Sequence, residues 1–258
     1  MAAAALSGDP LRLDGRSALV TGASRGIGRA VAEALAAAGA NIAINYARSK
    51  DEAEAAGAAV RSFGVDVAVL QADVADADAV ARLFEQLRQR WDGVDIVVNN
   101  AAVVHDGYVM LMPVEAWDRV VAVSLRGTFL CSRQALRPMI RRKWGRIVNV
   151  ISPAALLGKD GAANYAAAKG GVLSFTKSLA REVGRYGITV NAVCPGLVDT
   201  QMIAHLPESQ RQQFKEEIAL GRFGEPGEVA QTIRFLASPA AAYVTGSTLT
   251  VDGGLTMA

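Results

Sequence analysis

The chain has 258 residues, and its composition excludes several classes of protein. Hydrophobic residues make up 51% of the chain and charged residues 20%, which excludes disorder over most of its length because such a composition can bury a core. Its 27 Lys and Arg residues against 25 Asp and Glu residues leave a net charge of +2, too small to indicate a nucleic-acid binder. The two cysteines, Cys131 and Cys194, have no metal-binding spacing, which excludes a disulfide scaffold and favours a reducing compartment.

The first residues carry no recognisable targeting segment. Their alanine-rich apolar run ends at Leu6 and has no basic start, so it is too short for a secretory signal or a membrane span. No later apolar stretch is long enough to cross a bilayer without charges. We therefore expect a flexible N-terminal tail over residues 1–11 and a soluble cytoplasmic protein.

Short β-branched runs alternate along the chain with helical patterns. The predicted strands span Ser17–Thr21, Asn41–Tyr46, Val65–Gln71, Val94–Asn99, Arg146–Ile151, Ile188–Val193 and Ser247–Val251. The predicted helices span Gly26–Ala38, Lys50–Phe63, Asp76–Trp91, Glu115–Lys143, Asn164–Tyr186 and Glu208–Ala237. Most strand runs are continuously apolar, as strands buried on both faces should be. The alternation predicts one α/β domain over residues 12–258, a doubly wound, Rossmann-type parallel sheet of about seven strands with helices on both faces.

Glycine and proline residues refine this prediction. Gly39 and Gly187 each follow a helical pattern, at a place where a helix end favours a left-handed residue. The segment 198–227 carries Pro207, Gly221 and Pro226 around a short polar helix. We interpret this segment as an excursion above the sheet that forms a substrate lid.

The first predicted strand runs directly into a glycine-rich turn, which an alanine-rich helix follows. The turn reads Thr21-Gly22-Ala23-Ser24-Arg25-Gly26-Ile27-Gly28. Its three glycines permit a tight turn and a close approach of the backbone to a pyrophosphate, and the helix N-terminus offers free N–H groups to phosphate oxygens. Three glycines can also mark a turn alone, but the strand–turn–helix context favours dinucleotide binding.

The turn resembles that of the short-chain dehydrogenases/reductases, and further motifs of that family follow in order after about residue 12. They are Asp73-Val74, Asn99-Asn100-Ala101, Ser152, Tyr165-Ala166-Ala167-Ala168-Lys169 and Pro195-Gly196. The resemblance implies a nicotinamide-dependent oxidoreductase. The cofactor-binding residues it implies are Gly22, Ser24, Arg25, Gly26, Ile27, Gly28, Arg48, Ser49, Asp73, Val74, Asn99, Ala101, Tyr165, Lys169, Pro195, Gly196, Val198 and Thr200.

Three residues form the candidate catalytic set. Tyr165 and Lys169 are four residues apart, which places both on one face of a helix. A nearby ammonium and an oxidised nicotinamide would lower the pKa of the phenol, so that Tyr165 can protonate a carbonyl oxygen while hydride reaches the carbon. Ser152 ends a predicted strand and can bond the same oxygen. A Tyr–Lys pair or a strand-end Ser alone is often structural, but together they resemble the family's Ser–Tyr–Lys triad.

The second predicted strand indicates the choice of cofactor. An acidic residue at its end would bind a ribose 2′-hydroxyl, but this place falls at Tyr46, and the first carboxylate is Asp51. Arg48 and Arg25 could instead bind a 2′-phosphate, although Arg48 could also be a solvated loop residue. We therefore expect NADP(H) rather than NAD(H).

Two positions depart from the family's pattern. Ser124 stands where the family usually has an Asn that holds a water in a proton relay to the Lys, and a hydroxyl has fewer hydrogen-bonding groups than a carboxamide. Ala102 stands where the family prefers Gly. The histidines, His105 and His205, share no cluster with cysteines or carboxylates, so we predict no metal site.

The substrate is indicated by resemblance and by charge. The segments Asn164–Gly171, Leu220–Pro226 and Val244–Gly254 resemble those of 3-oxoacyl-[acyl-carrier-protein] reductases. Nine basic residues and no acidic one lie between Arg119 and Lys159, most densely at Arg137, Arg141, Arg142, Lys143 and Arg146. This run could dock an acidic carrier protein or could simply be solvated.

The resemblance thus implies NADPH-dependent reduction of a 3-oxoacyl thioester by a homotetramer, in fatty-acid synthesis or a polyketide-like pathway. Two alternatives stay open at this point. The chain could be a reductase or dehydrogenase for small alcohols, sugars or steroids, or a non-catalytic NADP-binding module.

Overall fold

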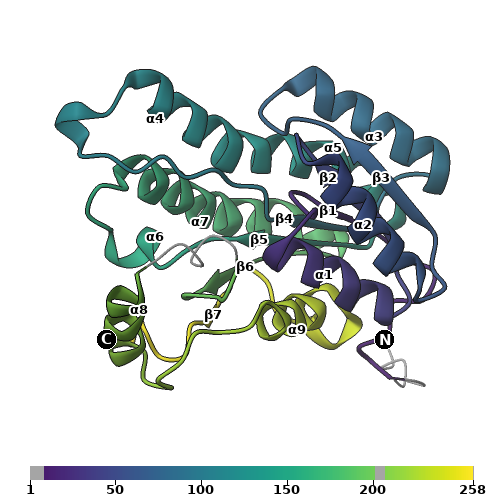
Figure 1. Ribbon diagram of the computed structural model, residues 1–258. Helices are drawn as coiled ribbons and strands as arrows, with labels where there is room; N and C mark the ends of the chain where they lie inside the picture. Colours follow the sequence, from purple (N-terminus) through teal and green to yellow (C-terminus); the bar gives the residue numbers. More distant parts are fainter. Residues whose placement is uncertain (1–8, 201–206, 258) are drawn as a thin grey trace.

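The computed structural model describes residues 9–200 and 207–257. Within that part of the chain, seven parallel strands form one sheet in the order β3-β2-β1-β4-β5-β6-β7 (Figure 1). The strands are β1 (Ser17–Val20), β2 (Asn41–Tyr46), β3 (Val67–Gln71), β4 (Ile96–Asn99), β5 (Gly145–Val150), β6 (Ile188–Pro195) and β7 (Thr248–Val251). The strand order reverses between β1 and β4, which opens the ligand crevice of a doubly wound sheet at their carboxyl ends. The predicted α/β doubly wound fold is confirmed.

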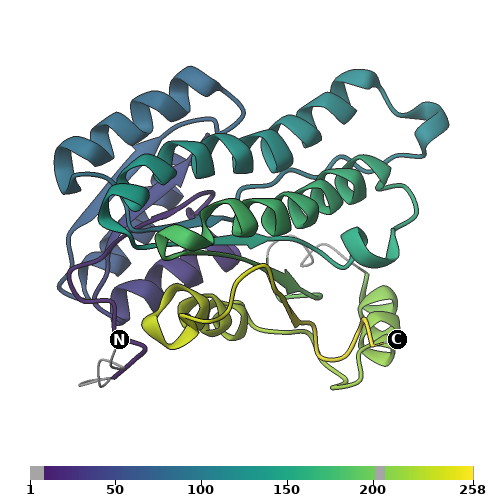
Figure 2. The ribbon, with the colours of Figure 1, turned by 180° about the vertical axis from the view of Figure 1, so that it is seen from behind.

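Helices cover both faces of the sheet. They are α1 (Gly26–Ala37), α2 (Lys50–Arg61), α3 (Ala77–Trp91), α4 (Val114–Val121), α5 (Gly127–Arg142), α6 (Ala154–Leu157), α7 (Ala163–Val183), α8 (Glu208–Glu217) and α9 (Pro226–Ala237). One core cluster joins α1, α2 and α9 to the sheet, and another joins α3, α5 and α7 to its opposite face. Figure 2 shows α5 and α7 side by side, with α9 on the other side of the sheet.

The apolar runs became strands because both of their faces are covered. Every residue of β1, β4, β5 and β6 is buried, and neighbouring side chains of β1 enter different core clusters, Val20 on one face and Leu19 on the other. Buried apolar surface contributes about 25 cal/mol per Å² to folding. The continuous hydrophobic pattern is therefore what a parallel sheet between two helical layers requires.

Two predicted helices are interrupted. The predicted helix Glu208–Ala237 is wrong as a single element, because Gly221 has φ +68° and the backbone between α8 and α9 forms a bridge from Gly224 to Val198. The predicted helix Glu115–Lys143 contains one π-helical turn, Ala122–Arg126, between α4 and α5. The helix ends at Gly39 and Gly187 are as predicted, with φ +99° and +73°.

The segment before β1 is described from residue 9 onward. The carbonyl of Pro10 accepts a hydrogen bond from the Ala240 amide at 3.2 Å, so residues 9–11 lie against the end of α9. Residues 1–8 of the predicted tail lie outside the described residues. In the described ranges, no helix is both long and apolar enough to cross a membrane.

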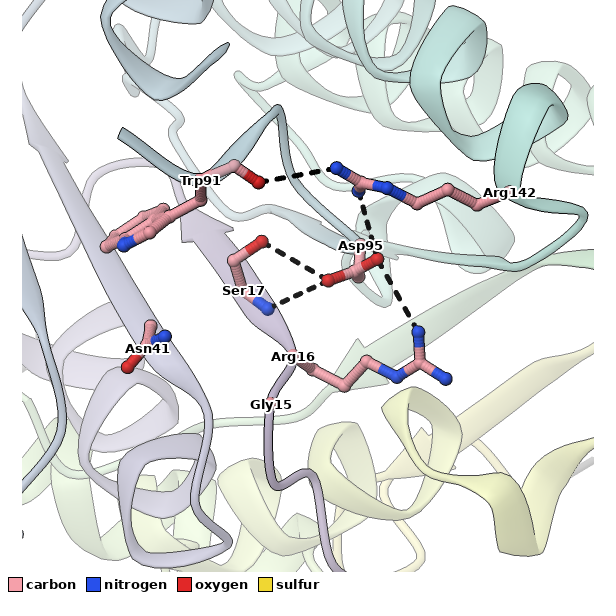
Figure 3. Close-up of a pocket in the computed structure, with 7 residues that line it drawn as sticks. All are labelled: Gly15, Arg16, Ser17, Asn41, Trp91, Asp95 and Arg142. Carbon is pink, nitrogen blue, oxygen red and sulfur yellow. Dashed lines mark hydrogen bonds and ion pairs between the residues drawn. The ribbon is translucent and has the colours of Figure 1, made fainter. Parts of the chain in front are cut away.

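The amino edge of the sheet holds a buried charge network, shown in Figure 3. The Asp95 carboxylate, 6% exposed, accepts hydrogen bonds from the Ser17 amide at 3.0 Å and the Ser17 hydroxyl at 3.3 Å. Its other oxygen accepts from Arg142 at 3.1 Å, and Arg16 lies 3.6 Å away. A buried carboxylate is tolerated only when it is paired and hydrogen-bonded in this way. The network therefore connects β1, β4 and α5 at the edge opposite the crevice.

We expect Asp95→Asn to lower the free energy of unfolding by about 1–3 kcal/mol, because an amide there loses the charge that its buried partners need. The matched control is Asp92→Asn, since the Asp92 side chain is 67% exposed and exposed ion pairs contribute at most about 1 kcal/mol. Urea denaturation measures both variants. Equal losses in the two would contradict a structural role for Asp95.

Candidate active site

The glycine turn leaves a shallow backbone cradle at the end of β1. Gly22 and Gly26 have φ +62° and +56°, values that favour glycine. A Cβ atom on Gly28 would lie 2.4 Å from the Gly22 carbonyl oxygen, so any side chain there would fill the turn. The α1 N-terminus that follows has no capping side chain and no acidic residue in its first turn. A helix N-terminus of this kind fits the pyrophosphate of a dinucleotide.

The loop after β4 is tied to this turn. The Thr21 hydroxyl accepts hydrogen bonds from the Asn100 and Ala101 amides, both at 3.0 Å, and the Asn100 amide side chain donates to the carbonyls of Thr21 and Gly22. Asn99 differs, because its side chain is 4% exposed and donates to Asn149 at 2.8 Å. Asn100 therefore joins the two loops, and the Asn99 side chain instead joins two strands of the sheet.

The loop after β6 runs beside the same turn. A Cβ atom on Gly26 would lie 3.5 Å from the Thr200 methyl group. At the start of the loop, a Cβ on Gly196 would lie 2.6 Å from the Cβ of Asp252, so glycine is needed for this close approach. Val198 is buried and bridges to Gly224. The structure thus brings two of the predicted cofactor segments together, although they are far apart in the chain.

Charged side chains gather at the far end of the cradle. Arg25 lies 3.5 Å from the Glu52 carboxylate, and Arg119 donates to Asp73 at 2.8 Å. Burial acts to raise the pKa of Asp73, but the hydrogen bonds from the Ala75 amide and Arg119, with the charge of Arg48 nearby, outweigh it and lower that pKa. The side chain of Val74 packs against Gly127, so only its backbone faces the crevice side.

The three candidate catalytic residues meet where β5 ends. Ser152 follows β5, and Tyr165 and Lys169 lie one turn apart on α7. Lys169 is 2% exposed, and its ammonium donates to the Val150 carbonyl at 2.6 Å and lies 5.7 Å from the centre of the Tyr165 ring. The Ser152 hydroxyl acts to lower the pKa of the Tyr165 phenol. The predicted set is therefore one cluster at the carboxyl edge of the sheet.

Burial controls the ionisation of this cluster. It raises the pKa of Tyr165, and the hydrogen bond with Ser152 only partly opposes the rise. Burial also lowers the pKa of Lys169 from 10.5 to about 8. The predicted lowering of the Tyr165 pKa by the ammonium and an oxidised nicotinamide concerns the complex with the cofactor; among the protein's own groups burial dominates, and the net direction is a rise. A raised pKa keeps the phenol protonated at neutral pH, as a proton donor to a carbonyl must be.

The two departures from the family's pattern have different consequences. Ser124 lies in the π-helical turn and is 1% exposed, and its hydroxyl has no hydrogen-bond partner within residues 9–200 and 207–257. π-Helical turns are frequent at functional sites, and this one packs against α7. Ala102 has no left-handed backbone, so its methyl group fits without strain.

Asn164 is a residue whose role the sequence analysis missed. It is completely buried; its side-chain amide donates to the His105 carbonyl at 3.0 Å, and its side-chain oxygen accepts from the Tyr165 amide at 2.7 Å. It therefore connects the loop after β4 to the start of α7. A polar residue beside the catalytic Tyr was the available signal. The side chain of His105 is exposed, and His205 lies outside the described residues.

The comparisons with known proteins agree with this geometry. A family model described as enoyl-(acyl carrier protein) reductase matches residues 22–256. The chain belongs to the short-chain dehydrogenase/reductase family. It is 46% identical over 246 residues to the 3-oxoacyl-[acyl-carrier-protein] reductase of Synechocystis sp., covering 95% of this chain and 98% of that protein. It is 44% identical over 242 residues to the FabG reductase of Staphylococcus aureus, covering 94% and 98%.

A solved structure confirms the fold of this family member. A short-chain type dehydrogenase/reductase from Mycobacterium marinum superimposes with a TM-score of 0.90 at 33% identity, covering 97% of this chain and 99% of the other. The near-complete coverage on both sides leaves no large insertion in either chain. The glycine cradle and the Ser–Tyr–Lys cluster thus lie on the scaffold of a short-chain oxidoreductase.

We expect Lys169→Met to stabilise the fold by about 1–3 kcal/mol at pH 7, because it removes a buried ammonium. The pKa of Lys169 is lower in the folded chain (about 8) than its usual 10.5, so the unfolded chain binds more protons between these values and the wild type gains stability as pH rises through them. The advantage of the variant should therefore disappear near pH 10.5. Urea denaturation at pH 7 and 10.5 measures this, with the exposed Lys177→Met as the control. A variant that is less stable than wild type at pH 7 would contradict the penalty.

Proposed function

We propose that the protein reduces a 3-oxoacyl thioester on acyl carrier protein to the 3-hydroxyacyl thioester, with NADPH as the reductant. The observation that carries the proposal is the cluster of Ser152, Tyr165 and Lys169 at the carboxyl edge of the sheet, where the Lys169 ammonium lies 5.7 Å from the centre of the Tyr165 ring and the glycine turn lies at the same edge. The relatives from Synechocystis and Staphylococcus aureus, which bear the name of this activity, support the substrate class.

The chemistry adds a hydride and a proton across one carbonyl group. NADPH supplies the hydride to the carbonyl carbon. Ser152 donates a hydrogen bond to the carbonyl oxygen, and Tyr165 gives that oxygen its proton as negative charge develops there. Lys169, with its ammonium near the Tyr165 ring, stabilises the phenolate that the transfer leaves. The products are an alcohol and the oxidised cofactor, and the phenol regains its proton from solvent.

The proposed cofactor site combines the segments that the structure brings together. The cradle from Gly22 to Gly28 would hold the pyrophosphate, and Asp73 and Val74 would hold the adenine. The loop from Pro195 to Thr200 would hold the nicotinamide, with backbone groups contributed by Asn99 and Ala101. Ser24, Arg25, Arg48 and Ser49 line the place of the 2′-phosphate, where cationic and hydroxyl groups suit a dianion.

Fewer basic side chains of the segment Arg119–Lys159 are available to a partner than the sequence indicated. Arg141 and Arg142 pair with Asp92. Arg146 is 3% exposed and its guanidinium stacks over Trp144 at 4.6 Å, so burial lowers its pKa to about 10. The earlier grouping of these three residues as a docking cluster is therefore revised. Arg133 and Arg137 on α5 and Lys143 directly after it are exposed and form the proposed docking surface for an acidic carrier protein.

The proposed assembly is a homotetramer in which the predicted helices Glu115–Lys143, now α4 and α5, and Asn164–Tyr186, now mainly α7, pair with their copies. The outer face of α4 exposes Val114 and Trp117 together with acidic side chains, and the outer face of α5 exposes Phe129 and arginines. The C-terminal strand region would form the second contact. Light scattering that gives a monomer would contradict the proposal.

Two further features complete the proposal. The segment 198–227 is the proposed substrate lid, and its residues 201–206 lie outside the described residues. Cys131 and Cys194 are buried free thiols, which supports a reducing compartment such as the cytoplasm.

We expect Tyr165→Phe to reduce turnover of acetoacetyl thioesters at least about 100-fold, because the proton donor is lost, while the dissociation constant of NADPH stays within about twofold. NADPH absorbance and fluorescence titration measure the two quantities. Full activity in the variant would remove Tyr165 from the mechanism. Turnover of other ketones but not of thioesters would favour the alternative substrates, and NADPH binding without any turnover would favour a binding module.

We expect Arg48→Ala to weaken NADPH binding much more than NADH binding, since only NADPH carries the 2′-phosphate. Titration of each cofactor gives the two ratios, and Arg61→Ala, at the other end of α2, is the matched control. Equal losses for both cofactors would contradict the assignment of Arg48.

A further inference from the structure

The start of α2 carries a helix-capping pattern that the structure does not use. Ser49-Lys50-Asp51-Glu52 has the Ser-x-x-Glu spacing of a capping box, in which each side chain satisfies the other residue's amide. The Ser49 side chain makes no capping hydrogen bond, and Glu52 instead lies 3.5 Å from the Arg25 guanidinium. At α9, by contrast, the Glu225 amide donates to the Glu228 carboxylate at 2.7 Å. Glu52 is therefore drawn away from its local partner by Arg25.

The position of Glu52 leaves one of its oxygens unsatisfied. Its Oε1 atom faces Arg25, but its Oε2 atom is inaccessible to solvent and has no hydrogen-bond partner in the described parts of the chain. A carboxylate oxygen that loses water without gaining a donor is destabilised. The contact with Arg25 therefore leaves the Glu52 carboxylate incompletely satisfied, and a stronger ligand for the guanidinium could replace it.

The second acid–base contact at this end of the cradle is different. The Asp73 carboxylate accepts hydrogen bonds from the Ala75 amide and from Arg119. Asp73 is therefore fully engaged without Arg48, which only lies near enough to affect its charge. Of the carboxylates beside the two candidate phosphate-binding arginines, Glu52 is the one with an unsatisfied oxygen.

We propose that Glu52 is a specificity-determining residue that competes with the 2′-phosphate of NADP(H) for the guanidinium of Arg25. The inference rests on the proposed function, because it requires Arg25 to bind that phosphate. Both the carboxylate and the phosphate are anions, so they compete for the same N–H groups and repel each other when both are close. The 2′-hydroxyl of NADH does not compete with Glu52 for Arg25. Glu52 therefore lowers the affinity for NADPH but not for NADH, and so reduces the preference for NADPH.

The Glu52 side chain has another hydrogen-bond donor within reach once the phosphate displaces it from Arg25. When a phosphate takes over Arg25, Glu52 becomes able to turn toward the Ser49 amide and form its half of the capping box. This movement gives the carboxylate a donor and stabilises the first turn of α2. Glu52 acts in this way on cofactor binding and not on hydride transfer, so its substitution should change the dissociation constant of the cofactor.

The test is direct titration of NADPH, NADH and the fragment 2′,5′-ADP by calorimetry, without substrate. We expect Glu52→Gln to lower the dissociation constants of NADPH and 2′,5′-ADP by about three- to tenfold, and to change that of NADH less than about twofold. Glu54→Gln is the matched control, because Glu54 is an exposed glutamate on the same helix. In the double variant Arg25→Ala/Glu52→Gln, the gain from Glu52→Gln should vanish, which shows that it acts through Arg25.

Three outcomes overturn the inference. Glu52→Gln could leave the ratio of NADPH to NADH affinity unchanged, could shift both affinities alike, or could weaken NADPH, which would make Glu52 a residue that positions Arg25 for the phosphate. If Arg25→Ala still weakens NADPH selectively, these results remove only the role of Glu52. If wild type binds both cofactors equally and Arg25→Ala and Arg48→Ala affect both alike, the 2′-phosphate assignment falls as well.

Discussion

The candidate active site depends on the burial of the Lys169 ammonium group near the Tyr165 phenol. Lys169 is 2% exposed, and the carbonyl of Val150 is the hydrogen-bond acceptor that the structure provides for it. No carboxylate accounts for its shift; burial is the first cause of the lowered pKa. Burying a charge in this way opposes folding, so the surrounding sheet and helices must supply the stability. The continuous apolar strands on both sides of β5 provide it.

The same burial explains why the cluster suits reduction. A solvated Tyr–Lys pair would keep a mobile ammonium and a phenol of ordinary acidity. Here α7 holds the ammonium fixed near the ring, and the low-polarity surroundings keep the Tyr165 proton in place until negative charge appears on a nearby oxygen. Asn164, at the start of α7, bonds both the Tyr165 amide and the His105 carbonyl and so ties the helix to the loop after β4. The geometry is therefore matched to giving a proton rather than taking one.

Charge is divided between the two edges of the sheet. At the amino edge, Asp95 accepts hydrogen bonds from Ser17 and Arg142, and these bonds hold β1, the start of β4 and α5 together. At the carboxyl edge, the charged side chains stand around an open cradle, and one of them, Glu52, is left incompletely satisfied. Complete satisfaction is typical of a structural network and incomplete satisfaction of a binding site. This contrast separates stabilising from functional charges in a chain whose net charge is close to zero.

Much of the architecture could be predicted from local patterns. The strand runs and the glycine turn needed only the chain's own periodicity, because a strand buried on both faces must be apolar throughout. The four-residue spacing of Tyr165 and Lys169 sufficed to place them on one helical face. The break between α8 and α9 was signalled by Gly221 and Pro226, but only the structure shows that the backbone between these helices pairs with the distant Val198.

The sequence by itself thus determined the layers, the glycine turn and the candidate catalytic groups, because each of these depends on residues close together in the chain. Only the tertiary structure decided the direction of the Tyr165 pKa shift, the loss of Arg141, Arg142 and Arg146 from the free basic surface, and the pairing of Glu52 with Arg25. These properties depend on burial and on partners 27 or more residues away. Solvation and charge pairing arise from the packing of distant segments, and no local pattern contains them.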